Sequence, residues 1–220
     1  MIARQRGNTT EFVYERLLED LQQGKYLPGD KLTTDALSTG YGVSRTPVRE
    51  ALVRLERDGL LVSDLNTGFR VKTLTLREIC DLYELREVLE GLAVAKLTER
   101  GATAEVLAQL RQCSEGHRNA STLEERKIND HKFHTLIYDN CGSRPLRELM
   151  HNYLVLSIVF NVTTQALGGP SHVSRRQKFI SHEHEAIIAA IESRNPTLAR
   201  RLLSAHIAAA RKEIAKLIEP

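Results

Sequence analysis

The chain has 220 residues with 31 basic and 28 acidic side chains, and its formal net charge is +3. This length can form one large domain or two modest ones. So small a net charge excludes an overall basic field, and any affinity for nucleic acid must come from the local placement of Arg and Lys and from dimerisation. The absence of Trp and an aromatic fraction of 5% argue against recognition of single strands by stacking.

Cysteine usage and hydropathy predict the compartment. The three cysteines, Cys80, Cys113 and Cys141, are scattered and lack CxxC spacing, which indicates a reducing environment without a disulfide framework. No apolar run reaches the length of a membrane span, and the first residues lack a signal-peptide core. We therefore expect a cytoplasmic protein that does not engage a membrane.

The segment Tyr41–Leu52 predicts a tight turn followed by a short helix. Gly42 permits the turn between two helices. Ser44 or Thr46 can cap the new helix, and Pro47 stands where a missing amide proton is harmless. The helix should bury an apolar stripe at helical spacing, formed by Val48, Ala51, Leu52 and Leu55.

Two arginines of this helix lie beside each other and off the apolar stripe. Arg45 and Arg49 are four residues apart, so their guanidinium groups share one face. Such a face suits the major groove of DNA, where Arg bonds guanine bidentately. The same spacing is also typical of an ordinary solvated helix face. The flanking segments are needed to distinguish a DNA-binding face from a solvated one.

The flanking segments predict a winged helix-turn-helix. Residues 24–32 form a turn-rich link out of a first helix. After the arginine helix come two short apolar segments, residues 60–62 and 69–71, on either side of Asn66-Thr67-Gly68. This pattern predicts a β-hairpin. Three helices followed by a hairpin favour the DNA-binding interpretation.

The organisation changes near residue 72. We expect a DNA-binding domain over residues 1–72, a connector over 73–76 and a helical domain over 77–220, so the fold class is mainly α. Strand signals nearly vanish beyond the connector, and Gly and Pro breaks predict six helices, at 76–100, 102–117, 121–139, 144–167, 174–193 and 196–218. The inner face of the first should carry Ile79, Leu82, Leu85, Leu89 and Leu92.

Four residues of the helical domain predict a metal site. Asp130 and His134 are four apart on one helix and point the same way. His184 lies eleven residues before Asn195 and His206 eleven after it, so an antiparallel helical hairpin brings both imidazoles to one level. Both lie within apolar stripes. Three His and one carboxylate suit Zn, with Ni or Mn as alternatives, and leave open positions for an oxygen ligand.

Other interpretations of these four residues stay open. A histidine facing the core is often a hydrogen-bonded core residue. The site could serve a metalloenzyme that activates water, but Glu183 and Glu185 project away from His184 and no separate nucleophile or general acid is apparent, so we expect no enzyme. A metal could also be purely structural. The remaining histidines show no such convergence: His117, His131, His151, His172 and His182.

The first 71 residues resemble the N-terminal domain of GntR-family bacterial transcription regulators. The resemblance rests on Pro28-Gly29, Leu37-Ser38, the run from Gly42 to Leu52, Leu55-Glu56, Asp58-Gly59-Leu60 and Gly68. It implies that Arg45 and Arg49 read bases and that Ser44 and Thr46 bond phosphate. It also implies that the wing tip at Gly68 approaches the minor groove.

One position departs from the family pattern. Members often carry Glu-Arg or a similar charged pair before the Leu-Ala of the second helix, whereas Thr34-Asp35 stands there in this chain. An arginine contact made by some relatives is therefore absent. The preferred operator should differ accordingly.

Residues 76–218 resemble the FCD effector domain of the FadR-type branch, and six helices resemble its VanR-like subgroup. The matched elements are Leu82-Tyr83-Glu84-Leu85-Arg86, Leu89-Glu90, Asp130-xx-Phe133-His134, Glu183-His184-xx-Ile187 and Ala205-His206-Ile207. The resemblance implies that the Asp and three His hold a divalent metal, which binds the carboxylate of a small hydroxy acid or sugar acid. Arg86 would help to bind that carboxylate, or would pair on the surface with Glu90.

The two resemblances together imply a function. Family members are homodimers, and two winged helices related by a twofold axis imply a palindromic operator. We therefore expect a ligand-responsive bacterial regulator of transcription. The resemblance alone implies that it is a repressor. Binding of the effector would release the protein from double-stranded operator DNA.

Overall fold

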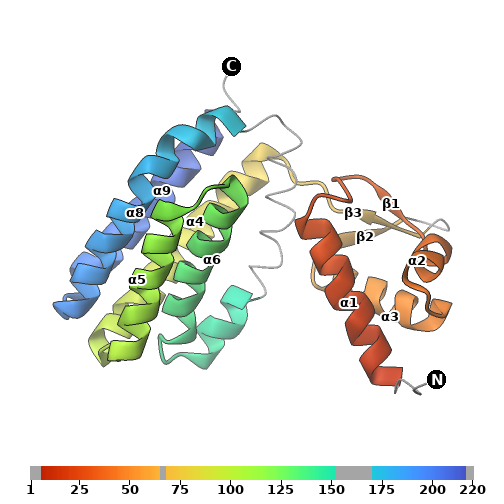
Figure 1. Cartoon of the computed structure of the whole chain (residues 1–220), viewed down its shortest axis with the longest axis horizontal. Helices are drawn as coiled ribbons and strands as arrows, with labels where there is room; N and C mark the ends of the chain where they lie inside the picture. Colours follow the sequence, from red (N-terminus) through yellow and green to blue (C-terminus); the bar gives the residue numbers. More distant parts are fainter. Residues whose placement is uncertain (1–5, 65–67, 152–169, 217–220) are drawn as a thin grey trace. The chain divides into compact units, whose positions relative to one another are not determined.

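The computed structural model describes residues 6–64, 68–151 and 170–216, with side chains for 9–64, 68–151 and 179–216. The chain divides into two compact units between Thr75 and Leu76 (Figure 1). Mainly helical structure with a small three-stranded sheet in the first unit confirms the predicted fold class.

The first unit is a winged helix. Its elements are α1 (Arg6–Gln22), β1 (Lys31–Leu32), α2 (Thr34–Tyr41), α3 (Arg45–Arg57), β2 (Leu61–Asp64) and β3 (Gly68–Val71). Helices α1 and α2 both pack on α3. The sheet is antiparallel in the order β1-β3-β2. The β2–β3 hairpin was predicted, whereas β1 was not, because two residues are too few to give a strand pattern.

The turn into α3 has the predicted form. Gly42 ends α2 with a left-handed φ of 66°, the conformation that glycine adopts without strain. Ser44 is the N-cap of α3, but its side chain makes no capping hydrogen bond. The stripe Val48, Ala51, Leu52 and Leu55 is fully buried. Burial of this stripe leaves the opposite face of α3 to solvent.

Gly68 has a structural reason to be glycine. Its φ is +118°, and an added Cβ would lie 2.7 Å from the carbonyl oxygen of Leu32. Leu32 pairs with Phe69 in the β1–β3 register, so a side chain at 68 would separate the two strands. The turn residues 65–67, which complete the predicted wing tip, lie outside the described residues.

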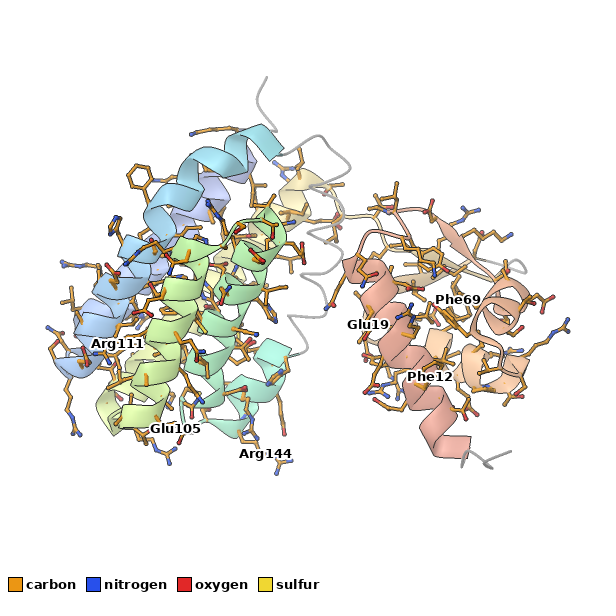
Figure 2. All side chains as sticks on the ribbon, viewed as in Figure 1. Phe12, Glu19, Phe69, Glu105, Arg111 and Arg144 are labelled. Atoms are coloured by element: carbon orange, nitrogen blue, oxygen red, sulfur yellow. The ribbon has the colours of Figure 1, made fainter. Side chains whose placement is uncertain are left out.

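The second unit is a bundle of helices, drawn side by side in Figure 1. They are α4 (Leu76–Arg100), α5 (Ala104–Asn119), α6 (Leu123–Asp139), α8 (Pro170–Glu192) and α9 (Pro196–Ala215). Helix α4 packs on α9, α6 and α8, while α5 packs on α6 and α8. Charged pairs join the outer surfaces, for example Arg111 of α5, labelled in Figure 2, with Glu192 of α8.

Helix ends follow local capping chemistry. Thr122 and Glu125 form a reciprocal capping box at the start of α6. Asn195 caps α9 with Pro196 at its first position.

The helix predicted over residues 76–100 is observed without change, and the other predicted helices shift by a few residues at their ends. A further helix begins at residue 144 and is described to 151, so the rest of the predicted 144–167 lies outside the described residues.

The predicted inner face of α4 is wrong at Leu85 and Leu92, whereas Ile79 is buried and Leu82 and Leu89 are half-buried. Leu85 and Leu92 are 56% and 40% exposed, and Val88 between them is 60% exposed. The buried face instead carries Glu90 and Gly91. A Cβ at Gly91 would lie 2.9 Å from Oγ of Ser204, so the small residue permits the close approach of α9. We call Leu85, Val88 and Leu92 the α4 stripe.

Candidate functional site

Four side chains from three helices of the bundle converge on one point. Asp130 and His134 come from α6, His184 from α8 and His206 from α9. Each offers one ligand atom, and these four atoms lie within 4.8 Å of one another. The structure therefore brings together all four residues that the sequence predicted, because the turn at Asn195 sets the register of α8 against α9 as expected.

Distances within the cluster suit metal ligation. The Nε2 atoms of His134 and His206 are 3.2 Å apart. Oδ1 of Asp130 is 3.3 Å from Nε2 of His184 and 3.8 Å from Nε2 of His134. Ligand atoms held about 2.1 Å from one ion lie about 3.0–3.4 Å from each other at tetrahedral or octahedral angles. The closest separations fall in or near this range.

Several atoms of the cluster make no hydrogen bond, although Oδ1 of Asp130 and Nε2 of His184 lie close to each other. Oδ1 of Asp130 and both ring nitrogens of His184 are buried and make no hydrogen bond to any described residue. The three histidines are at most 5% exposed. A buried polar atom without a partner costs roughly 1–3 kcal/mol, which coordination of a cation would offset. The residues present therefore fit a divalent metal.

Two glutamates hold the outer nitrogens of the histidines. Nδ1 of His134 donates to Glu90 of α4, and Nδ1 of His206 donates to Glu183 at 2.6 Å. A carboxylate on Nδ1 fixes the tautomer, so Nε2 keeps its lone pair toward the centre of the cluster. Neither glutamate was predicted in this role. The only signal was that Glu183 precedes His184 and that Glu90 belongs to a matched motif.

Arg86 reaches the cluster through Glu90. Its Nε donates to Glu90, which is 1% exposed, while the Arg86 side chain is 19% exposed. The ion pair that the sequence allowed is therefore present but buried. Burial alone would raise the pKa of Glu90, yet the charges of Arg86 and His134 lower it to about 2. Glu90 is thus an anion at neutral pH.

The protonation states favour a bound cation. Burial lowers the pKa of His184, which favours the neutral imidazole that a metal requires. Burial opposes ionisation of Asp130, but its contact with His184 and the nearby imidazoles hold its pKa well below the usual range. Divalent Zn, Ni or Mn accepts a carboxylate anion together with imidazoles in their neutral form, and binding of the cation would replace the protons that the imidazoles carry.

One further histidine lies near the cluster and was missed. His117 of α5 is 1% exposed, and its ring centroid is 6.1 Å from that of His184. Phe133 stacks on the other side of His184 at 3.7 Å. His182, in contrast, is 73% exposed, as its spacing from His184 predicted. Packing of α5 on α8 brings His117 close, and no local spacing shows that.

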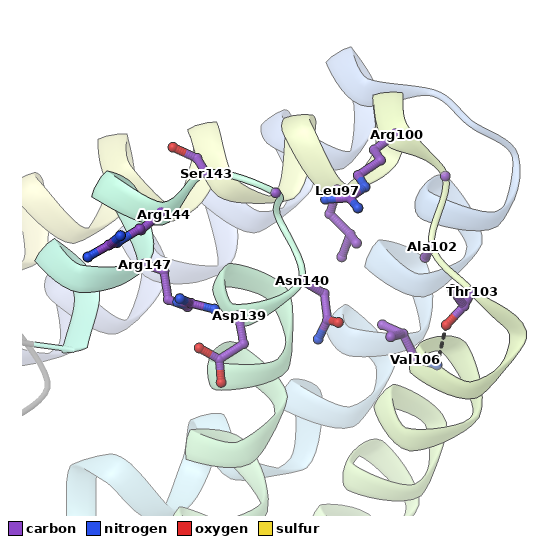
Figure 3. A pocket seen from close by; sticks show the side chains of 12 residues that line it. Leu97, Arg100, Ala102, Thr103, Val106, Asp139, Asn140, Ser143, Arg144 and Arg147 are labelled. Atoms are coloured by element: carbon purple, nitrogen blue, oxygen red, sulfur yellow. Dashed lines mark hydrogen bonds between the residues drawn. The ribbon is translucent and has the colours of Figure 1, made fainter.

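A separate pocket of about 390 Å³ lies where α4 turns into α5 and where α6 turns toward residue 144 (Figure 3). Arg100, Arg144 and Arg147 are among its lining residues. None of the four cluster residues lines it. This pocket and the cluster are therefore different features of the bundle.

In the winged helix, the predicted DNA-binding side chains of α3 are accessible. Ser44, Arg45, Thr46 and Arg49 are all exposed at the start of the helix. The Arg45 side chain is 75% exposed, and its Nε lies 2.8 Å from Oδ1 of Asp35 on α2. These residues form one polar surface, since the apolar stripe of α3 faces the opposite side.

A winged helix followed by a helical domain with a candidate metal cluster is typical of a DNA-binding regulator of transcription. Residues 9–71 match the profile described as bacterial regulatory proteins of the gntR family, and residues 81–209 match the FCD domain. The chain therefore belongs to the GntR family of regulators that carry an FCD domain. This family consists of transcription regulators, so the prediction that the chain is not an enzyme is confirmed.

Individual relatives agree with this assignment. The uncharacterised HTH-type transcriptional regulator YdhC of Bacillus subtilis (strain 168) is 28% identical over 200 residues, which cover 88% of this chain and 85% of YdhC. The HTH-type transcriptional repressor GlaR of Escherichia coli (strain K12) is 25% identical over 203 residues, which cover 88% of this chain and 90% of GlaR.

Solved structures show the same fold. E. coli McbR/YncC superposes with a TM-score of 0.80 at 23% identity over the whole of both chains. A putative GntR regulator from Rhodococcus sp. RHA1 gives a TM-score of 0.79 at 22% identity, covering 94% of this chain and 97% of that one.

Among the helices of the described residues, none is both long and apolar enough to cross a bilayer.

Proposed function

We propose that this protein is a repressor that binds a palindromic operator as a homodimer and responds to a small carboxylate through a divalent metal in its helical domain. The buried Asp/His cluster carries the proposal, because its orphaned atoms suit a cation and it lies in a domain joined to a winged helix. The proposed domains are residues 1–72 and 77–220, with the connector at 73–76. The relative GlaR is named a repressor, which supports this direction of control.

DNA contacts are proposed for the exposed start of α3. Arg45 and Arg49 read base edges in the major groove, while Ser44 and Thr46 bond phosphate. Gly68 brings the wing near the minor groove, in addition to its structural role beside Leu32. Replacing either arginine with Ala should cost about 1–3 kcal/mol and relax base preference at one position per half-site.

A homodimer is proposed because the α4 stripe is exposed in the described part of the chain. Leu85, Val88 and Leu92 are 40–60% exposed on one helix face, three large apolar side chains at spacings of three and four. Such an uncovered stripe is typical of an interaction surface. In a dimer with a twofold axis, the α4 stripe of each copy would be buried against the other copy. This contact would set the distance between the two recognition helices.

The effector is proposed to be a hydroxy acid or a sugar acid. A divalent ion on the cluster, Zn first and Ni or Mn as alternatives, supplies open coordination positions for a carboxylate oxygen. Arg86 stands next to the cluster, and its Nη groups are the part not engaged by Glu90 in the Nε contact. They can neutralise part of the charge of the acid. We also propose the VanR-like subgroup, on the predicted pattern of six helices.

The test is thermodynamic coupling. A thermal-shift screen of the metal-loaded protein with malate, gluconate and succinate selects an acid, whose affinity is then measured with and without operator DNA. We expect about 5- to 150-fold weaker binding with operator, in line with usual coupling energies. His184→Ala should abolish the response, and His182→Ala, on the exposed side of α8, should retain it. Equal affinities in the wild type would contradict the proposal.

A further inference from the structure

Asp35 and Arg45 form an ion pair across the turn between α2 and α3. Asp35 lies in the first turn of α2 and Arg45 is the first residue of α3. Oδ1 of Asp35 is 2.8 Å from Nε of Arg45, and the two side chains are 69% and 75% exposed. An exposed pair of this kind contributes about 0–1 kcal/mol to folding, so stability does not explain it.

The atom used by Asp35 leaves the reading edge of Arg45 open. A guanidinium has five N–H donors, one on Nε and two on each terminal nitrogen. With Asp35 beside Nε in an ion pair, the two terminal nitrogens still present a parallel pair of N–H groups. This is the edge that fits O6 and N7 of guanine.

Another arginine of the same domain, Arg70, is engaged within the protein through more of its nitrogens. Arg70 of β3 uses Nε on Asp64 at 2.8 Å and also Nη1 on the carbonyl oxygen of Gly29 at 3.2 Å. Two of its three nitrogens are thereby fixed within the protein. Arg70 thus stabilises the wing. The Asp35 contact, in contrast, leaves the terminal nitrogens of Arg45 available for DNA.

The carboxylate also has an electrostatic effect on the surface around Arg45. A negative charge beside the arginines repels phosphates, which weakens binding to DNA of any sequence. That loss is offset only where Arg45 meets its guanine, because the low dielectric of a closed interface strengthens both the ion pair and the base contact. One carboxylate can therefore raise the ratio of specific to non-specific affinity.

We propose that Asp35 is a specificity-determining positioning residue, which aims Arg45 at one guanine in each half-site and lowers the affinity for other DNA. The inference rests on the proposed base-reading role of Arg45. Asp35 acts through Arg45 and does not itself contact the base.

The experiment uses the full-length protein and a duplex selected from random sequences by the wild type. The base pair read by Arg45 is located first, as the position whose preference Arg45→Ala relaxes. In Asp35→Asn, discrimination at that same position should fall about 5-fold or more, within the range of a bidentate contact, and affinity for random duplex should rise a few-fold. Asp35→Glu, which keeps the charge, should restore part of both effects.

A matched control exists in the same domain, at Glu11 of α1. Glu11→Gln removes the carboxylate charge from an exposed pair with Arg54 of α3, at 2.6 Å, without touching Arg45. It should leave discrimination and random-duplex affinity unchanged. The melting temperatures of Asp35→Asn and wild type should agree, which excludes a general loss of structure.

The outcomes separate the inference from the proposed function. If Arg45→Ala relaxes one position but Asp35→Asn does not, the positioning role is wrong and the base-reading role stands. If Asp35→Asn has the same effect in the Arg45→Ala background as in the wild type, Asp35 acts independently of Arg45, which also overturns the inference. If Arg45→Ala weakens selected and random duplexes equally, base reading by Arg45 fails and the inference fails with it.

Discussion

The two units of this protein use the same chemical pair, an arginine and a carboxylate, in opposite surroundings. In the winged helix, Asp35 and Arg45 are both mostly exposed. In the bundle, Glu90 is 1% exposed and is shared between Arg86 and His134 of the Asp/His cluster. Water screens the first pair, so it contributes little to folding and remains available for DNA. The second pair is desolvated, so loss of one partner leaves a buried charge behind.

The largest expected effect comes from breaking the buried pair. Glu90→Gln should destabilise the bundle by about 3–5 kcal/mol, since Arg86 would keep its charge without a counter-ion. Chemical denaturation of metal-free protein measures the change, which keeps metal affinity out of the comparison. The double variant Arg86→Met with Glu90→Gln should recover part of the loss. A Glu90→Gln variant as stable as the wild type would mean that Glu90 contributes nothing beyond its volume.

Metal removal should have the next largest effect. A ligand at about a hundred times its dissociation constant adds about 2.7 kcal/mol of stability, so chelation should lower the melting temperature of the wild type measurably. Affinity should fall in acid, because protonated imidazoles do not bind metal, and the lowered pKa of His184 places protonation of that ligand below the ordinary histidine value of about 6.5. Calorimetry of metal binding between pH 5 and 8 tests the direction. Affinity that stays flat over that range would argue against histidine ligands.

A third prediction concerns a buried carboxylate of the winged helix. Asp20 accepts from Lys25 at 2.6 Å and from Tyr41 at 2.7 Å. Burial alone would raise the pKa of Asp20, but these two partners lower it below its ordinary value. Asp20→Asn should cost about 1.5–3 kcal/mol at neutral pH, the usual range for hydrogen bonds to a charged group.

The sign of its pH dependence follows from the lowered pKa. The ionised form of Asp20 is favoured in the folded state, so its contribution is present above the ordinary pKa near 4 and is lost as pH falls through the folded value. The stability difference between the wild type and Asp20→Asn should therefore shrink in acid. Urea titrations at pH 7 and pH 3 measure it. A difference that is constant with pH would show that the charge of Asp20 does not matter.

The smallest effect on folding should come from the exposed pair. Asp35→Asn should change the free energy of unfolding by less than about 0.5 kcal/mol, as for most surface substitutions. The same variant is expected to change DNA discrimination. Denaturation and duplex binding measured on one preparation would sharpen the contrast with Glu90→Gln. A large loss of stability in Asp35→Asn would contradict the view that the exposed pair, unlike the buried one, contributes little to folding.

Local patterns predicted the features that lie within one helix or one turn. The α3 stripe, the exposed Arg45 and Arg49 and the hairpin follow from spacing over a few residues. The metal cluster was also predictable, because the Asn195 turn sets His184 opposite His206. No spacing, however, tells which helix covers which face of another, and for that reason Glu90 and His117 were missed as neighbours of the cluster.

The α4 stripe illustrates the same limit from the other side. Periodicity identified an apolar line through Leu85 and Leu92 but could not tell whether it meets the chain's own bundle or something outside it. The structure gives the inner position to Glu90 and Gly91, a charged residue and a residue without a side chain. The first is buried because Arg86 and His134 satisfy it, and the second because α9 approaches closely.

Metal content of protein purified without a metal-affinity tag tests the central claim most directly. Elemental analysis of the wild type, of His184→Ala and of the exposed-histidine control His182→Ala should be done on parallel preparations. The account predicts about one divalent ion per chain in the wild type and in His182→Ala, and little or none in His184→Ala. No metal in the wild type, together with unchanged stability after chelation and after addition of Zn, Ni or Mn, would contradict it.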